Sequence, residues 1–198
     1  MVLRPQNKKI ADSSTDMVIL LENTDPGTNA GSESCSLMTH DLFQKNTLKI
    51  YFAGSIRGGR EFVRVYETIV KTLENFGHFV LTKHVADGSL SAETDHSDPV
   101  DVYSRDMKWL RAADLVVAEV TVPSLGVGYE LGMATSLRKP TLCLYHESKD
   151  LSALSNLIRG VREPEFSVRL YESDTQVEII ISEFLESCSA DKAETPPK

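Results

Sequence analysis

Two glycine-rich segments contain the residues best suited to chemistry. Residues 54–60 read GSIRGGR and residues 124–132 read SLGVGYELG. Glycines let the backbone approach a ligand closely, while Ser55 and Arg57 add a hydroxyl and a guanidinium that suit an anion. The first segment matches neither the P-loop nor the G-x-G-x-x-G pattern. Taken alone, it fits an anion-binding loop and a long strand-to-helix turn with an exposed arginine equally well.

The second segment predicts a helix with an acid near its beginning. Ser124 can cap that helix, and Glu130 would lie in its first or second turn, facing the sheet edge. Such an acid either answers the helix dipole or does chemistry. Gly126, Gly128 and Gly132 each weaken a helix by roughly 1 kcal/mol relative to alanine. A close helix–strand contact or a ligand would explain why they are there.

Three further side chains are candidates. Asp106 precedes Trp109 by three residues, which places it partly on the inward face of a helix, either paired with an arginine or held for catalysis. Periodicity alone favours the ion pair. Glu119 ends an apolar strand, where an acid is more often structural. Tyr51 and Phe52 alternate along a strand, so one of them faces the same sheet edge as the glycine turn.

No metal or cofactor is predicted. His78, His84 and His96 fall near one strand and its following polar loop, but neither an H-x-x-x-H nor a Cys/His pattern accompanies them. A G-x-S-x-G elbow is also missing, so serine hydrolase chemistry has no support. The three cysteines are odd in number and lack metal-type spacing, which predicts reduced thiols.

The elements that must position these residues alternate between strand and helix. The predicted strands are 48–53, 78–82, 114–120, 141–145 and 168–171, and the predicted helices are 61–76, 102–112, 125–137, 152–158 and 176–186, with a polar loop over 87–99. This alternation predicts a doubly wound α/β fold with a parallel sheet of about five strands and helices on both faces. Ligands then bind beyond the carboxyl ends of the strands, here just after Ala53 and Val120.

Composition divides the chain into three parts. Residues 1–46 predict a flexible extension, residues 47–188 a single catalytic domain, and residues 189–198 an unstructured tail. The net charge of −8 disfavours a nucleic-acid surface, although one local pocket could still hold a phosphate. No apolar run has the length of a signal peptide or a membrane span, so we expect no membrane partner and a cytoplasmic location. The nucleus is a second location, for which the basic pair Lys8 and Lys9 is too short to be evidence.

Four segments in the same order carry a family resemblance: residues 51–60 (YFAGSIRGGR), Asp106 ahead of Trp109, residues 114–120 (DLVVAEV) and residues 124–132. Together they resemble the nucleoside 2-deoxyribosyltransferase family, in particular its members that hydrolyse 2'-deoxynucleoside 5'-phosphates. The resemblance covers about residues 48–187. It implies a flavodoxin-like fold and cleavage of the N-glycosidic bond of deoxynucleoside monophosphates to free base and 2-deoxyribose 5-phosphate.

The resemblance also implies roles for individual residues. Glu130 matches the nucleophile that attacks C1' and forms a covalent deoxyribosyl intermediate. Asp106 matches the second catalytic carboxylate, which helps to protonate the departing base and to activate water. Tyr51 matches the tyrosine that orients the nucleophile. The substrate-binding positions are Gly54, Ser55, Ile56, Arg57, His84, Ser124, Gly126 and Ser155. Within this set Ser55, Arg57, Ser124 and Gly126 would bind the 5'-phosphate, and His84 would line the base pocket. Ser155 would reach the site of the neighbouring subunit in a homodimer, with Ser152 as a competing match.

Two other functions remain open from the sequence. A nucleoside 2-deoxyribosyltransferase would use the same glutamate, but would not need Arg57 if it acted on unphosphorylated nucleosides. A non-catalytic nucleotide-binding module would use the same pocket without turnover, and the acids would then be structural. The combination of Tyr51, Asp106 and Glu130 with a phosphate pocket favours the nucleotide hydrolase.

Overall fold

The computed structural model describes residues 47–94 and 96–193, so the expectations for residues 1–46 and 194–198 lie outside the described part of the chain. Five parallel strands form one sheet in the order β2-β1-β3-β4-β5. The strands are β1 (Lys49–Ala53), β2 (Phe79–Val80), β3 (Leu115–Glu119), β4 (Thr141–His146) and β5 (Phe166–Tyr171). This is the flavodoxin-like order of a doubly wound fold, and it confirms the predicted fold class.

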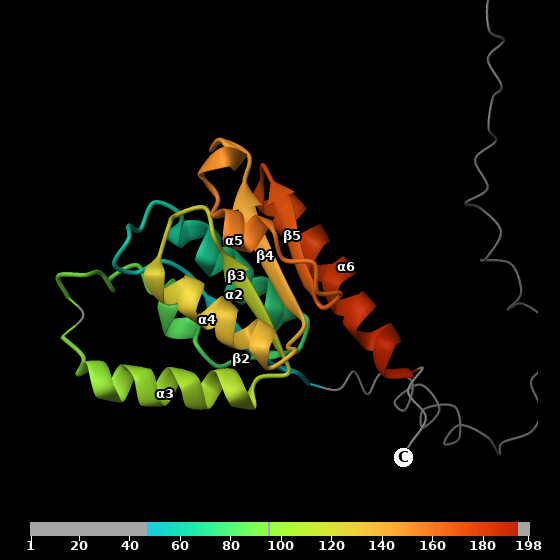
Figure 1. Ribbon diagram of the computed structural model, residues 1–198, viewed down its shortest axis with the longest axis horizontal. Coiled ribbons are helices and arrows are strands. Elements are labelled where there is room, and N and C mark those ends of the chain that lie inside the picture. The colour runs from blue at the N-terminus through green and yellow to red at the C-terminus, as the bar shows by residue number, and fades with distance from the viewer. Residues whose placement is uncertain (1–46, 95, 194–198) are drawn as a thin grey trace, which may run out of the picture. The chain divides into compact units, whose positions relative to one another are not determined.

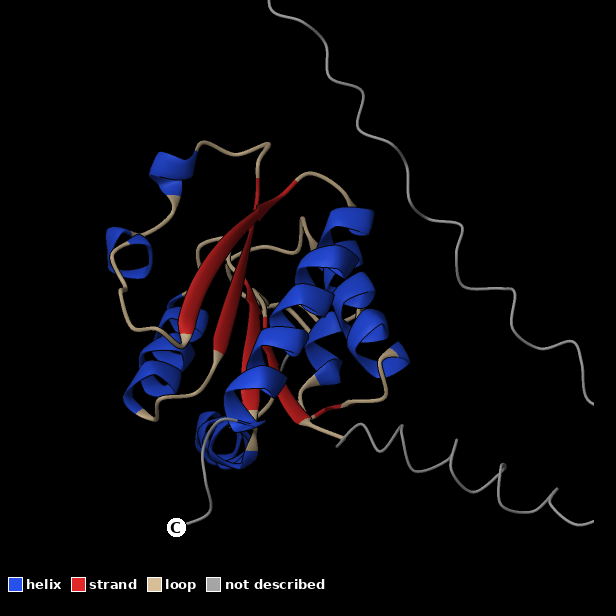
Figure 2. Cartoon of the chain, turned by 90° about the vertical axis from the view of Figure 1, so that its right-hand side faces the viewer, coloured by secondary structure: helices blue, strands red, loops and turns tan. Residues whose placement is uncertain are grey.

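Helices cover both faces of the sheet (Figures 1 and 2). Helices α2 (Val63–Asn75) and α6 (Asp174–Ala193) pack on one face, while α3 (Pro99–Ala112) and α4 (Leu125–Ser136) pack on the other. The short α5 (Asn156–Arg159) and the 3-10 turns η2 (Lys83–Ala86) and η3 (Leu151–Ala153) complete the connections. No helix within residues 47–94 and 96–193 combines the length and apolar character needed to cross a bilayer.

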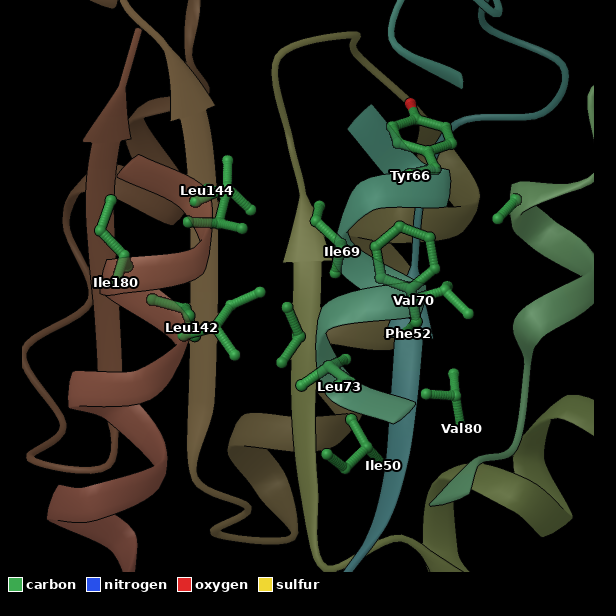
Figure 3. Packing of buried hydrophobic residues seen from close by; sticks show 14 of the residues in the cluster. Ile50, Phe52, Tyr66, Ile69, Val70, Leu73, Val80, Leu142, Leu144 and Ile180 are labelled. Atoms are coloured by element: carbon green, nitrogen blue, oxygen red, sulfur yellow. The ribbon is translucent and has the colours of Figure 1, made fainter. Parts of the chain in front are cut away.

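Successive side chains of a strand point to opposite faces of the sheet, so only every second residue of β1 can face the site. On β1, Phe52 packs in the core on the α2–α6 face, where its ring lies 5.5 Å from that of Tyr66 (Figure 3). Its neighbour Tyr51 therefore points to the α3–α4 face. Every residue of β3 is buried, as expected for a central parallel strand. The sheet thus separates two cores, and the catalytic candidates belong to one of them.

Two elements near the site differ from the predicted ones. Strand β2 has two residues instead of five, because the side chain of Thr82 takes over the pairing: its Oγ1 accepts from the Phe52 amide (2.8 Å) and donates to the Phe52 carbonyl (2.6 Å). Helix α3 begins at Pro99, three residues earlier than predicted. Asp98 caps it by accepting from the amides of Val100 and Asp101, and proline suits the first helical position.

The carboxyl-terminal third also differs in detail. The helix predicted over 152–158 is split into η3 and α5, and β5 begins two residues earlier than expected. Helix α6 continues to Ala193, so residues 189–193, which the composition predicted to be unstructured, are helical. No proline occurs between residues 174 and 193, and the Ser189 hydroxyl bonds back to the Leu185 carbonyl (2.9 Å), which is compatible with a continuing helix.

Candidate active site

The catalytic candidates gather where the sequence places them, at the carboxyl ends of adjacent strands β1 and β3. A cavity of about 90 Å³ lies there, and β1, the loop after it, η2, α3 and α4 all contribute to its wall. Among the predicted site residues, its lining contains Tyr51, Gly54, Ile56, His84, Asp106 and Glu130. In a sheet of this order the strand connections diverge between β1 and β3, which leaves an opening for a ligand.

Tyr51 and Glu130 both line this cavity and are hydrogen-bonded to each other. Ser124 caps α4 by accepting from the Val127 amide (3.4 Å), so Glu130 lies in the second turn, as predicted. The Tyr51 hydroxyl donates a hydrogen bond to Glu130 Oε1 over 2.8 Å. A buried strand residue thus fixes one oxygen of the carboxylate and leaves the other available to a reacting atom.

The surroundings of Glu130 and Tyr51 raise the pKa of both side chains. Burial raises the pKa of Glu130 to about 7, and the nearby charge of Asp106 adds to the rise, while the hydrogen bond from Tyr51 opposes it. Burial and the charge of Glu130 also raise the pKa of Tyr51 far above its ordinary value. Tyr51 therefore stays protonated as a donor, while Glu130 changes charge close to neutral pH.

Asp106 combines the two interpretations that the sequence left open. Its carboxylate lines the cavity and is also paired with an arginine, since Arg105 Nε lies 2.8 Å from Asp106 Oδ1 and Arg105 Nη2 lies 3.3 Å from Oδ2. The same Nη2 lies 3.4 Å from His84 Nε2. The guanidinium also lies over the ring of Trp109 at 5.1 Å, and that ring is 5.7 Å from the imidazole of His84. Asp106 is therefore both the ion-pair partner of Arg105 and a carboxylate that lines the cavity.

Hydrogen bonds of Ser55 and Arg60 fix the loop that follows β1. Ser55 is fully buried, its amide donates to the Tyr66 hydroxyl (3.1 Å), and its own Oγ has no hydrogen-bond partner among the described residues. Arg60 donates to the Ser55 carbonyl (3.0 Å) and to the Asp87 carbonyl (2.6 Å). Ser55 Oγ is therefore a buried hydroxyl whose hydrogen-bonding capacity the described residues leave unused.

The same loop packs tightly against the segment before α4. A Cβ placed on Gly58 would lie 2.3 Å from the Pro123 carbonyl oxygen and 2.8 Å from Ser55 Oγ. Glycine is therefore required for the contact between the two loops that the sequence singled out as anion-binding candidates. Their proximity is compatible with one shared phosphate site.

The remaining predicted binding residues lie outside the catalytic cavity. Ser124 and Ser155 line a second, larger cavity of about 490 Å³, which is walled mainly by apolar side chains. Arg57 and Gly126 are exposed and line neither cavity, and neither does the buried Ser55. The structure of one chain thus brings the three catalytic candidates together with His84, but does not gather the predicted phosphate-binding residues into the same cavity.

One of the two explanations suggested for the glycines of α4, a close helix–strand contact, does not apply to Gly128 and Gly132. A Cβ on Gly128 or Gly132 would meet nothing within 4 Å, so no close helix–strand contact requires them. The exposed side of α4 also carries Leu125 (97% exposed) and Tyr129 (52% exposed). The interpretation as a helix–strand contact was wrong, because these positions face outward from the chain.

Glu119 lies on the other face of the sheet, although it belongs to a strand that ends at the site. It is fully buried on the α2–α6 side and accepts from Thr121 Oγ1, the Thr121 amide (3.2 Å) and the Tyr171 hydroxyl (3.1 Å). Burial raises its pKa to about 7, against the effect of these hydrogen bonds. Because side chains alternate between the two faces along β3, Glu119 lies on the face of the sheet opposite to Tyr51 and Glu130. This position favours a structural role for Glu119.

The sequence analysis did not select the one arginine among the residues that line the cavity. Arg105 lines it beside Asp106, and the available signal was its position directly before that acid and four residues before Trp109. Within residues 47–94 and 96–193, no group of three or more His, Cys, Asp or Glu side chains is placed to hold a metal. The described site is therefore a pair of carboxylates with a tyrosine donor at the switch point of a parallel α/β sheet. Carboxylate pairs of this kind suit the cleavage of glycosidic bonds through an oxocarbenium-like state.

Comparison with known proteins identifies the family. The model of the family described as nucleoside 2-deoxyribosyltransferase matches residues 50–190, and the chain belongs to this family. A relative from Danio rerio named 5-hydroxymethyl-dUMP N-hydrolase is 47% identical over 142 residues, which are 71% of this chain and 97% of the relative. The Homo sapiens protein of the same name is 45% identical over 141 residues, 70% of this chain and 79% of that one.

A solved structure agrees on the fold. The solution structure of BlsM superposes with a TM-score of 0.59 at 19% sequence identity, covering 76% of this chain and 96% of that one. At this identity the likeness concerns the fold alone.

Proposed function

We propose that this protein hydrolyses the N-glycosidic bond of 2'-deoxynucleoside 5'-monophosphates, releasing the free base and 2-deoxyribose 5-phosphate. The observation that carries the proposal is the 2.8 Å hydrogen bond from Tyr51 to Glu130 in a cavity that Asp106 also lines. The relatives named 5-hydroxymethyl-dUMP N-hydrolase, at about 45% identity over most of the chain, support the same activity and the same class of substrate.

The proposed reaction has two steps. In the first, the Glu130 carboxylate attacks C1' while the bond from C1' to the base nitrogen breaks, and the departing base takes up a proton that Asp106 helps to supply. In the second, Asp106 activates a water that attacks C1' and releases Glu130, so that the configuration at C1' is retained. Because the sugar lacks a 2'-hydroxyl, positive charge develops at C1' more easily, and two carboxylates are sufficient without a metal.

The 5'-phosphate is proposed to bind between the two glycine-rich loops. The free hydroxyl of Ser55, the guanidinium of Arg57 and the capped amino end of α4 at Ser124 and Gly126 supply donors for an anion. An anchored phosphate lets binding energy far from the reacting carbon position C1' against Glu130. Gly54, Ile56 and His84 would then contact the sugar and base from the cavity wall.

A homodimer would complete this site. Leu125 and Leu157 are 97% and 87% exposed, and both line the apolar cavity of about 490 Å³ beside Ser124 and Ser155. Exposed leucines around an apolar hollow are typical of an interface. In the proposed dimer Ser155 of each chain, which caps α5 at the surface, contributes to the phosphate site of the other.

The alternative within the family is transfer of deoxyribose to a second base. The Tyr51–Glu130 pair would serve both reactions, so the pair alone does not separate them. A phosphate-binding loop favours hydrolysis of nucleotides, since a transferase acting on nucleosides has no use for it. A binding module without turnover is disfavoured by the near-neutral pKa of Glu130, which suits a reacting carboxylate.

The test compares a deoxynucleoside monophosphate, its ribonucleotide and the unphosphorylated deoxynucleoside, with base release followed by chromatography. Glu130→Gln is the test variant and Glu178→Gln, on the exposed surface of α6, is the matched control. We expect release from the deoxynucleotide, lost by more than about 10³-fold in Glu130→Gln and unchanged in the control. Binding without release would leave a nucleotide-binding module, and base exchange on the nucleoside would indicate a transferase.

The shared site is tested by mixing two impaired variants. Glu130→Gln damages a chain's own site, whereas Ser155→Asp repels the phosphate in the partner's site. Random reassembly of the two should restore activity to roughly a quarter of the sites, because each mixed dimer has one intact site. A monomer in sedimentation, or no recovery on mixing, would contradict the dimer.

We propose that the protein acts in the cytoplasm, with the nucleus as a second location. The proposal rests on the sequence, in which no apolar run has the length of a signal peptide or a membrane span. Imaging of a tagged protein in cells tests this.

A further inference from the structure

Tyr66 contacts the loop after β1 from the α2–α6 side of the sheet. Its side chain is fully buried in the core on that side (Figure 3). A Cβ placed on Gly54 would lie 2.9 Å from Tyr66 Cε2, so a larger residue at position 54 would displace the ring. Gly54 also lines the catalytic cavity, whereas Tyr66 does not. The same glycine thus connects the wall of the cavity to a ring in the opposite core.

The hydroxyl of Tyr66 fixes the next peptide of this loop. It accepts a hydrogen bond from the Ser55 amide over 3.1 Å. Because this amide is engaged, the hydroxyl is the donor that remains at Ser55. Ser55 Oγ is buried without a hydrogen-bond partner among the described residues, and it lies 2.8 Å from the position of a Cβ on Gly58. The ring and the hydroxyl of Tyr66 together therefore determine how the loop holds the Ser55 side chain.

A buried carboxyl orients the Tyr66 hydroxyl. Since the phenol oxygen accepts from Ser55, its own proton needs another acceptor, and Glu119 supplies one. Burial raises the pKa of Glu119 to about 7, and a hydrogen bond from Tyr66 is among the interactions that oppose this rise. Burial and the charge of Glu119 raise the pKa of Tyr66 above its ordinary value, so the hydroxyl keeps its proton. Arg60 restricts the ring further, because its guanidinium lies over that ring at 5.5 Å and donates to the Ser55 carbonyl (3.0 Å).

We propose that Tyr66 is a positioning residue for the 5'-phosphate, which holds Gly54 and Ser55 in the arrangement that lets the Ser55 hydroxyl donate to the phosphate. The inference rests on the proposed function, in which the phosphate binds at this loop. Tyr66 touches neither the substrate nor the reacting atoms and acts through the two loop residues. Its effect is therefore confined to ligands that carry a phosphate.

The test compares two tyrosines that bond to the same carboxylate. Tyr66→Phe removes the hydroxyl that accepts from the loop. Tyr171→Phe is the matched control, because its fully buried hydroxyl donates to Glu119 Oε1 (3.1 Å) and makes no hydrogen bond to the loop within the described part of the chain. The KM and kcat for base release from dUMP are measured together with the Kd of inorganic phosphate by calorimetry. Inhibition by deoxyuridine reports binding without a phosphate.

We expect Tyr66→Phe to raise the KM for dUMP and the Kd of inorganic phosphate about tenfold, because a buried amide that loses its acceptor moves the loop. The kcat and the inhibition by deoxyuridine should stay within about threefold of the wild type, since the contact to the loop affects only phosphate binding. Tyr171→Phe should leave all four quantities unchanged. Gly54→Ala disturbs the same contact from the side of the loop, and the Kd of phosphate in this variant is the test if Tyr66→Phe does not fold.

Three outcomes would overturn the inference: an unchanged phosphate affinity in the test variant, an equal change in Tyr171→Phe, or an equal loss of affinity for deoxyuridine. In each of them Tyr66 would only stabilise the core. A wild type that binds no phosphate would overturn it as well. A wild type that binds phosphate but does not cleave dUMP would instead overturn the proposed function, and the phosphate affinities of the variants would still decide the inference.

Discussion

Replacing Tyr51 by phenylalanine removes one hydroxyl from the site and leaves the ring in the core. The lost interaction is the 2.8 Å hydrogen bond to Glu130 Oε1, which acts against the burial that raises the pKa of Glu130 to about 7. A hydrogen bond to a charged group contributes about 1.5–3 kcal/mol, and one pKa unit corresponds to about 1.36 kcal/mol. The variant should therefore raise the pKa of Glu130 by about 1–2 units above its wild-type value.

The sign of the effect on rate follows from the role of Glu130. In the proposed reaction the nucleophile is the Glu130 carboxylate, so we expect the rate to rise with pH until Glu130 is ionised. Tyr51 stays protonated throughout, because its own pKa is raised far above the ordinary value. At pH 6 the fraction of ionised Glu130 should fall about 10- to 100-fold in the variant, and the difference should shrink above pH 9.

The assay is kcat/KM for base release from a deoxynucleotide between pH 5 and 10. Tyr145→Phe is the matched control: it removes a hydroxyl of another buried tyrosine on the same face of the sheet, which donates to the Asp150 carbonyl (2.8 Å). The control should keep the midpoint of the acid limb near 7. A uniform loss in Tyr51→Phe at every pH, with the acid limb unmoved, would refute the reasoning, because the hydroxyl would then act on geometry alone.

Two further predictions concern the two sides of the sheet. Glu119 has a folded pKa of about 7 against an ordinary value of 4.5, so its contribution to the stability of the fold is greatest below pH 4.5 and falls as the pH rises through 7. Glu119→Gln should remove up to about 3 kcal/mol of this pH-dependent loss of stability. The measurement is the free energy of unfolding in urea at pH 5 and at pH 8. An equal difference between the two pH values in the variant and the wild type would contradict the prediction. Gly58→Ala brings a Cβ to 2.3 Å from the Pro123 carbonyl and should raise KM for the nucleotide at least about tenfold, since displaced loops no longer share one anion. Gly132→Ala, where a Cβ meets nothing within 4 Å, is its control, and an unchanged KM in Gly58→Ala would show that the loop contact does not matter for binding.

Local signals were enough to predict most elements and the edge of the sheet where the site lies. Alternating apolar strands and amphipathic helices predicted the parallel sheet, and the glycine segments after β1 and β3 predicted the place of the cavity. The start of α3 was missed although its signal was local, since Asp98 followed by Pro99 is a cap followed by a proline suited to the first turn. The length of β2 could not be predicted in this way, because the side chain of Thr82 replaces backbone pairing with β1 across 30 residues of sequence.

The interactions that determine the chemical properties of the candidate residues could be identified only from the tertiary structure. The sequence by its residue types and spacing determined that Tyr51 or Phe52 would face the site, that Glu130 would lie early in a helix, and that Asp106 would be paired or catalytic. The fold decided among these alternatives, because the hydrogen bond between Tyr51 and Glu130 joins residues 79 positions apart and exists only once β1 and α4 share a face of the sheet. Burial, which moves the pKa of Glu130 toward neutrality, is likewise a property of the packed chain and of no local segment.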